Sequence, residues 1–168
     1  MSSEFRVRSL ESNIPDPIKI YEFKSPNSEL NYSELMIFGT GIDIVNIERI
    51  ENMMARWGDL FLGRVFTERE IGWCQQRVRP PECFAIRFAA KEAFLKAIGL
   101  GLRIGIRWTD IEVENDPLGR PSFSFHQKAK EVFESLRIQQ ALLTLTHDRC
   151  YAVAHVLLEG RNDEGSNL

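Results

Sequence analysis

The chain has 168 residues, of which 43% are hydrophobic and 27% are charged, and its formal net charge at pH 7 is −3. This length and composition exclude a disordered polymer and indicate one folded domain, with or without an appendage. The small net charge excludes a generally basic nucleic-acid binder and a polyacidic tail protein, although residues 49–107 carry 11 basic and 6 acidic side chains.

The first boundary along the chain lies near Met36. Residues 1–35 contain Pro15, Pro17 and Pro26 among short polar residues, so we expect an N-terminal extension of uncertain order before a domain at residues 36–168. The N-terminus lacks the apolar core of a signal peptide, and no apolar run approaches the roughly 20 residues of a membrane span. We therefore expect a cytoplasmic protein.

A strand followed by a helix opens the predicted domain. Residues 38–45 are typical of a strand in which Asp43 points away from the isoleucines on either side of it. Asn46 is the predicted N-cap of the next helix, whose apolar residues recur every three or four positions. We expect this helix to end at Gly58.

Two further helices are expected before residue 100. Thr-Glu-Arg-Glu at residues 67–70 is a capping box, which predicts the start of the second helix. Pro80 and Pro81 predict the start of the third, whose apolar stripe ends at Gly99.

The second half of the chain changes to the period of strands. We expect strands at residues 108–114, 121–125, 141–146 and 151–159, a turn at 115–119 and a helix at 126–137. The predicted fold class is α+β, a single lobe in which helices pack on one face of a mostly antiparallel sheet.

The cysteines Cys74, Cys83 and Cys150 show neither a Cys-x-x-Cys motif nor the spacing of metal ligands. Their odd number in an expected cytoplasmic protein predicts that they are reduced, with Cys74 and Cys83 packing in the interior.

Acidic and basic side chains come together on the predicted third helix. Phe88, Glu92 and Lys96 share one face at four-residue spacing, so Glu92 could form a surface ion pair with Lys96. Asp43, in an apolar strand, could cap a helix or pair with an arginine. Two carboxylates with cations nearby also suit a magnesium–phosphate site, because Mg²⁺ keeps several waters and takes one or two carboxylates. Spacing alone leaves these interpretations open.

Five motifs occur in the order found in one enzyme family. They are Gly-Thr-Gly-Ile-Asp-Ile-Val at 39–45, Phe-Thr-Glu-Arg-Glu at 66–70, Arg-Phe-Ala-Ala-Lys-Glu-Ala-Phe-Leu-Lys-Ala-Ile-Gly at 87–99, Trp-Thr-Asp-Ile-Glu-Val at 108–113 and Leu-Thr-His-Asp-Arg at 145–149. Over about residues 36–160 the chain resembles the holo-acyl-carrier-protein synthases, the small bacterial class of 4'-phosphopantetheinyl transferases. Thr146 departs from the more usual serine, and residues 1–35 have no counterpart in the family's pattern.

The resemblance implies transfer of the 4'-phosphopantetheine arm of coenzyme A to a serine of apo-acyl carrier protein, in support of fatty acid biosynthesis. Holo-carrier protein and 3',5'-ADP would be the products. It implies that Asp43 and Glu92 bind Mg²⁺ and act in catalysis with Lys96, which would neutralise the diphosphate. Arg87, Lys96 and His147 would bind coenzyme A, the first and last near its nucleotide. The general base, the use of manganese and the preferred carrier protein stay open.

The predicted first helix carries a second distinct face. Arg49, Met53 and Arg56 recur there at four- and three-residue intervals, away from the apolar face. Such a face could be solvated arginines with one exposed methionine, or a basic surface for an acidic helix. The resemblance implies the second, with these three residues binding the acyl carrier protein.

The family also implies an assembly. Its single-lobe members are homotrimers with coenzyme A at the subunit interfaces, so we expect a homotrimer and neither nucleic-acid nor membrane partners.

Two other function classes stay open on the residues alone. One is a module that binds without turnover, against which the two carboxylates argue. The other is a different magnesium phosphotransferase, although the chain has no Gly-x-x-x-x-Gly-Lys-Ser/Thr run.

Overall fold

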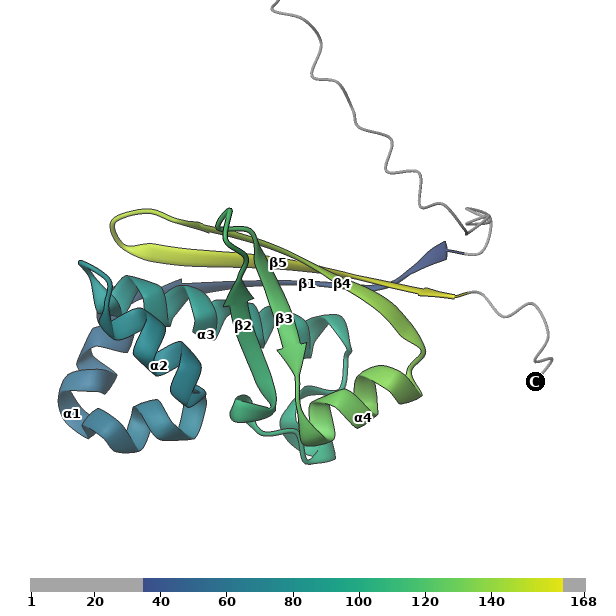
Figure 1. The fold of residues 1–168 in the computed structure, drawn as a ribbon, viewed down its shortest axis with the longest axis horizontal. Helices are drawn as coiled ribbons and strands as arrows, with labels where there is room; N and C mark the ends of the chain where they lie inside the picture. Colours follow the sequence, from purple (N-terminus) through teal and green to yellow (C-terminus); the bar gives the residue numbers. More distant parts are fainter. Residues whose placement is uncertain (1–34, 162–168) are drawn as a thin grey trace, which may run out of the picture. The chain divides into compact units, whose positions relative to one another are not determined.

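The computed structural model describes residues 35–161. Its elements are β1 (Leu35–Asn46), α1 (Ile47–Val65), α2 (Glu68–Gln75), α3 (Pro80–Ala97), the 3-10 helices η2 (Gly101–Ile104) and η3 (Trp108–Asp110), β2 (Ile111–Asn115), β3 (Pro121–Phe125), α4 (Gln127–Ser135), β4 (Ile138–His147) and β5 (Tyr151–Arg161). The α+β class and the predicted order of helices and strands are confirmed (Figure 1). The expected N-terminal extension lies outside the described residues, apart from Leu35.

The strands form two antiparallel sheets. β5 lies between β1 and β4, and β2 and β3 form a separate hairpin. The hairpin packs on α3 through aromatic rings, with Phe94 centred 5.5 Å from Phe123 and 4.6 Å from Phe125. The strand expected from residue 108 begins later, at Ile111, because Trp108–Asp110 forms a 3-10 turn that Arg107 and Asp110 cap.

α3 packs along one face of the β1–β5–β4 sheet (Figure 1). The backbones of β1 and α3 approach each other closely at Gly39 and Gly41. A Cβ atom at Gly41 would lie 2.7 Å from the amide nitrogen of Ala97 and closer still to the carbonyl oxygen of Ala93. The two glycines therefore allow the contact that brings Asp43, two residues further along β1, next to α3.

The predicted N-caps are confirmed, and one predicted helix end is wrong. The Asn46 side chain accepts a hydrogen bond from the Arg49 amide at 3.0 Å, and Thr67 and Glu70 form the reciprocal capping box of α2. α1 does not end at Gly58 but continues to Val65 across a kink. Gly58 adopts φ 48° and ψ −129°, a conformation that glycine tolerates and that turns the helix without ending it.

A buried ion pair joins the helices behind the sheet. The Lys91 ammonium donates to Glu70 Oε2 at 2.7 Å, to the Val65 carbonyl at 2.7 Å and to the Trp108 carbonyl at 3.1 Å. Both charged side chains are almost fully buried, at 0% and 1% exposed. Glu70 also accepts from the amide of Val113, so this pair connects α1, α2, α3 and the β2–β3 hairpin.

The expectation of reduced cysteines is wrong for two of the three. Cys74, in the last turn of α2, forms a disulfide with Cys83 in α3, and their Cα atoms are 5.3 Å apart. Cys74 is fully buried, as predicted, and Cys150 is free and exposed. Sequence spacing did not reveal the bond because it depends on how α2 and α3 fold back on each other. Among residues 35–161, no helix has the length and apolar character to cross a membrane.

Candidate active site

Asp43 and Lys96 form the centre of the first cluster of candidate residues. Asp43 comes from β1 and Lys96 from the last turn of α3, and the close approach of these elements places the Lys96 ammonium 2.7 Å from Asp43 Oδ1. The ammonium also donates to the Ile42 carbonyl at 3.1 Å. Asp43 thus pairs with a lysine instead of the arginine that was one expected partner. Lys96 forms its ion pair with Asp43 and not with Glu92 within α3.

Glu92 lies one helical turn before Lys96 and close to Asp43. Partial burial raises the pKa of the Glu92 carboxyl above its usual value, and the neighbouring Asp43 raises it further, while Lys96 and Arg49 act in the opposite direction. Two carboxylates that repel each other beside a lysine form a site that a cation stabilises.

The chemistry of this pair fits a magnesium ion better than a metal with several protein ligands. In the described part of the chain, no group of three or more His, Cys, Asp or Glu side chains could hold a metal ion. Two carboxylates match the coordination of Mg²⁺, which retains waters and accepts substrate phosphate oxygens as its remaining ligands. Asp43 and Glu92 are therefore the residues that could hold such an ion.

Arg87 and His147 belong to a second cluster, in a cavity of about 1190 Å³. The α2–α3 connection, the start of α3, the β2–β3 hairpin and β4 form its walls. Residues with polar or aromatic side chains in its lining are Trp73, Arg77, Arg79, Glu82, Arg87, Asn115, Asp116, Arg120, Ser122, Gln140, Thr144 and His147. Asp43, Glu92 and Lys96 are not among the lining residues, so the two clusters occupy different parts of this chain.

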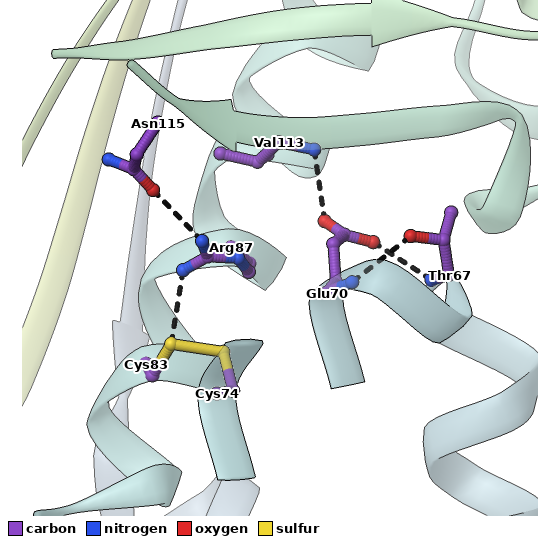
Figure 2. The surroundings of a disulfide bond; sticks show 7 residues. All are labelled: Thr67, Glu70, Cys74, Cys83, Arg87, Val113 and Asn115. Carbon is purple, nitrogen blue, oxygen red and sulfur yellow. Dashed lines mark hydrogen bonds between the residues drawn. A yellow bond between two sulfur atoms is a disulfide. The ribbon is translucent and has the colours of Figure 1, made fainter. Parts of the chain in front are cut away.

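Arg87 is a buried arginine whose guanidinium has unused hydrogen-bonding capacity. Its side chain donates to Asn115 Oδ1 at 2.9 Å and to Cys83 Sγ at 3.1 Å, and Figure 2 shows it between these two partners. Its Nε atom is buried without a hydrogen-bond partner. Burial lowers the pKa of Arg87, Glu70 partly offsets this, and Arg77 lowers the pKa further. An anion in the cavity would compensate this buried positive charge.

Arg49, Met53 and Arg56 lie together along the first half of α1. They line a shallow hollow of about 490 Å³ with Asn46, Glu48, Asn52 and Trp57. The Arg56 guanidinium lies 5.0 Å from the centre of the Trp57 ring, which is 51% exposed. The hollow adjoins the first cluster, because Arg49 is close enough to Glu92 to lower the pKa of its carboxyl.

Sequence reasoning did not identify several residues of the large cavity. Trp73 and Arg77 come from the end of α2 and the connection after it, Asn115 and Arg120 come from the β2–β3 hairpin, and only the fold brings these two segments to one cavity. One signal was available, because Arg77 and Arg79 lie between two predicted helices within the positive region. The Arg77 guanidinium lies 4.0 Å from the centre of the Trp73 ring, so the two form one rim of the cavity.

Comparison with known proteins gives the chain a family context. The family model described as the 4'-phosphopantetheinyl transferase superfamily matches residues 39–154. A holo-[acyl-carrier-protein] synthase of Koribacter versatilis (strain Ellin345) is 52% identical over 124 residues, which cover 74% of this chain and 99% of the relative. The corresponding synthase of Syntrophus aciditrophicus (strain SB) is 47% identical over 128 residues, covering 76% and 100%.

Solved structures give the same result for the fold. The holo-[acyl-carrier-protein] synthase of Neisseria meningitidis aligns with a TM-score of 0.69 and 34% identity, covering 73% of this chain and 98% of that chain. The holo-(acyl-carrier-protein) synthase of Bacillus anthracis str. Ames, whose crystal structure is a complex with CoA (3',5'-ADP), aligns with a TM-score of 0.62 and 36% identity, covering 74% and 98%.

Proposed function

Because this chain belongs to the 4'-phosphopantetheinyl transferase superfamily, we infer that it is a transferase that moves the 4'-phosphopantetheine arm of coenzyme A to a serine of apo-acyl carrier protein. The products are holo-carrier protein and 3',5'-ADP. The observation that carries this inference is the cluster of Asp43, Glu92 and Lys96, in which two carboxylates and a lysine meet at the seam between β1 and α3. We propose fatty acid biosynthesis as the process that the holo-carrier protein serves.

We propose that Asp43 and Glu92 hold a magnesium ion in the working enzyme. The ion would supply positive charge next to the pyrophosphate of coenzyme A, where negative charge develops during transfer. Lys96, already 2.7 Å from Asp43, is placed to neutralise the same diphosphate. Transfer of this kind depends on positioning and charge stabilisation, so the protein needs no covalent nucleophile.

We propose that the large cavity receives the nucleotide end of coenzyme A. The buried guanidinium of Arg87, with its unpaired Nε, suits the 3'-phosphate, and His147 at the end of β4 lies in the same lining. The cavity walls carry three further arginines against the two carboxylates of Glu82 and Asp116, and this excess of positive charge favours an anionic ligand. Support for the ligand class comes from the Bacillus anthracis relative, whose crystal structure is a complex with CoA (3',5'-ADP).

We propose that the hollow on α1 receives the acyl carrier protein. Arg49 and Arg56 supply positive charge, and Met53 between them supplies a flexible apolar contact, which suits an acidic helix. Because Arg49 also lies near Glu92, a carrier bound here would present its serine close to the first cluster.

The separation of the two clusters supports active sites that neighbouring subunits share, and we propose a homotrimer. A single coenzyme A must reach both the carboxylate pair and the nucleotide cavity, so one subunit would supply the first and its neighbour the second. Among residues 35–161, the sheet face opposite α3 carries exposed apolar side chains, with Ile42 and Ile44 60% and 63% exposed on β1. We propose that subunits meet on this face. Analytical ultracentrifugation that detects a fully active monomer would exclude the trimer.

The direct test of the function is to weigh the product. The protein is incubated with coenzyme A, Mg²⁺ and an apo-carrier protein, and the carrier is expected to gain the mass of one phosphopantetheine. Glu92→Gln is expected to abolish this gain while the circular dichroism spectrum stays that of the folded protein. If several carriers all keep their original mass with the wild-type enzyme, the inferred activity is wrong. If the wild-type enzyme is active and Glu92→Gln modifies the carrier to the same extent, the metal assignment is wrong.

A further inference from the structure

We propose that Cys74 and Cys83 are a redox-active pair that controls how tightly the Arg87 cavity binds an anion. The identity of that anion, the 3'-phosphate of a nucleotide, rests on the proposed function. The disulfide itself and its contact with Arg87 do not, because both are features of this chain (Figure 2).

The two sulfur atoms occupy different environments. Cys83 is partly buried, lines the large cavity and contacts the Arg87 guanidinium at 3.1 Å. Cys74 is fully buried in the last turn of α2. A small reagent that enters the cavity therefore reaches the sulfur of Cys83 first, and Cys74 is available only from within the protein.

The surroundings of Cys83 favour a reactive thiolate when the bond is reduced. The cationic Arg87 side chain lies against the sulfur, and Cys83 is the fourth residue of α3, near the positive end of the helix dipole. Cationic neighbours and partial exposure are the conditions under which cysteines react. Cys83 is thus the attacking residue of the pair, and Cys74 is the residue that closes the bond.

The oxidant that we propose is a low-molecular-weight disulfide such as glutathione disulfide. The Cys83 thiolate attacks one of its sulfur atoms, which forms a mixed disulfide and releases one small thiolate. Cys74, as its thiolate, then attacks the Cys83 sulfur and releases the second. The small disulfide is reduced to two thiols, which take up the two protons that the cysteines lose, and the protein gains one disulfide.

The oxidised state should bind the nucleotide more tightly for two reasons. The disulfide closes the connection between α2 and α3, which carries Arg77 and Arg79 on the cavity wall. A restrained connection loses less conformational freedom when an anion binds. In the reduced state the Cys83 thiolate also competes with the ligand for Arg87, whereas a disulfide sulfur carries no charge.

The test measures binding of 3',5'-ADP to the full-length protein by calorimetry, after equilibration with glutathione disulfide or with excess reduced dithiothreitol. We expect the oxidised protein to bind about two- to tenfold more tightly, as expected for the ordering of one long side chain. Non-reducing peptide mass spectrometry should show a reversible loss of two hydrogens from the peptides that carry Cys74 and Cys83. Equal affinity of the two states, or no reversible mass change, would overturn the proposal.

Three variants separate this proposal from a merely structural disulfide. Cys83→Ser should lose all redox sensitivity and bind with an affinity between those of the two states, because serine removes both the disulfide and the competing thiolate. Cys74→Ser should stop at the mixed disulfide and gain the mass of one glutathione on Cys83. Cys150→Ser, which removes the exposed free thiol, should keep the full redox response. A redox response that survives in Cys83→Ser would refute the pair.

The outcome is distinguishable from failure of the proposed function. If 3',5'-ADP does not bind in either state but the disulfide forms and breaks reversibly, the nucleotide assignment of the cavity is wrong and the thiol chemistry stands. If 3',5'-ADP binds equally well in both states, the cavity assignment stands and the redox control is wrong.

Discussion

Replacing Gly41 by alanine should disrupt catalysis by moving α3 away from β1. The new Cβ would lie 2.7 Å from the Ala97 amide nitrogen, whereas ordinary van der Waals contact begins at 3.4 Å. The helix must therefore move by at least about 0.7 Å, the difference between those two distances, and by more to clear the Ala93 carbonyl oxygen. Both atoms belong to the backbone, so no side-chain rotation can relieve the clash.

The displacement acts directly on the cluster of Asp43, Glu92 and Lys96. Asp43 moves with β1 while the other two residues move with α3, so the separation of the carboxylates changes by a similar distance. A misplacement of about 1 Å can reduce a rate about 100-fold. Overpacking should also lower the free energy of unfolding by about 1–3 kcal/mol.

The assay follows formation of holo-carrier protein by mass spectrometry and unfolding by circular dichroism in urea. Gly63→Ala is the matched control, because a Cβ at Gly63 in α1 has no neighbour within 4 Å and the residue has no positive φ. This control should keep its rate and gain about 0.4–1 kcal/mol of stability, the helix preference of alanine over glycine. If Gly41→Ala turns over like wild type and unfolds at the same urea concentration, the close approach does not position the site.

Three other predictions concern charged side chains. Lys91→Met should lower the free energy of unfolding by about 3–5 kcal/mol, because Glu70 would remain buried without its partner. The double variant with Lys91→Met and Glu70→Gln should recover part of this loss. Urea titrations in which the single and double variants are equally unstable would contradict this. Glu92→Gln should stabilise the protein at pH 7 by about 1 kcal/mol or less, because the folded state raises the pKa of Glu92 and thus disfavours its ionised form. That gain is lost as pH falls below about 3, where the wild-type carboxyl is protonated in both states, so thermal melts that show the same gain at both pH values would contradict the assignment. Arg56→Glu should raise the KM for carrier protein about tenfold and leave the KM for coenzyme A unchanged, since Arg56 lines the hollow on α1 and not the nucleotide cavity. Equal increases in both constants in steady-state assays would argue against a docking role.

Local sequence signals predicted much of the fold. Asn46 and the Thr67–Glu70 box fix helix starts through contacts within four residues, and the structure has both. The end of α1 was misjudged because Gly58 is compatible with either a helix end or a kink. Packing decides between them, since Phe61 and Leu62 beyond the kink are buried.

The composition of the candidate site was also predictable, but not its geometry. Asp43 stood out as a carboxylate in an apolar strand, and Glu92 and Lys96 as neighbours on a helix face. Their meeting depends on contact between β1 and α3, which are 53 residues apart at the Asp43–Lys96 bond. Gly41 makes that contact possible, and in the sequence it is indistinguishable from a turn glycine.

The disulfide and the buried lysine show a similar limit. Cys74 and Cys83 are close in sequence, yet the bond requires two helices to return on each other at the right depth. Lys91 lies between residues of the predicted site, and only the fold shows that it points inward to Glu70 while Glu92 points toward β1. Tertiary packing decides such orientations, because neighbouring residues on a helix face directions about 100° apart.

The kink at Gly58 divides α1 into two stretches with different roles. Residues before it carry the proposed carrier-binding side chains, with Ile47 and Ile50 as their anchors in the core, and residues after it contribute Phe61 and Leu62 to the interior. Changes in the first stretch can therefore accumulate without repacking the second. Related enzymes that serve different carriers would be expected to diverge at residues 48–57, and exchanging this stretch between them should transfer carrier preference as a unit.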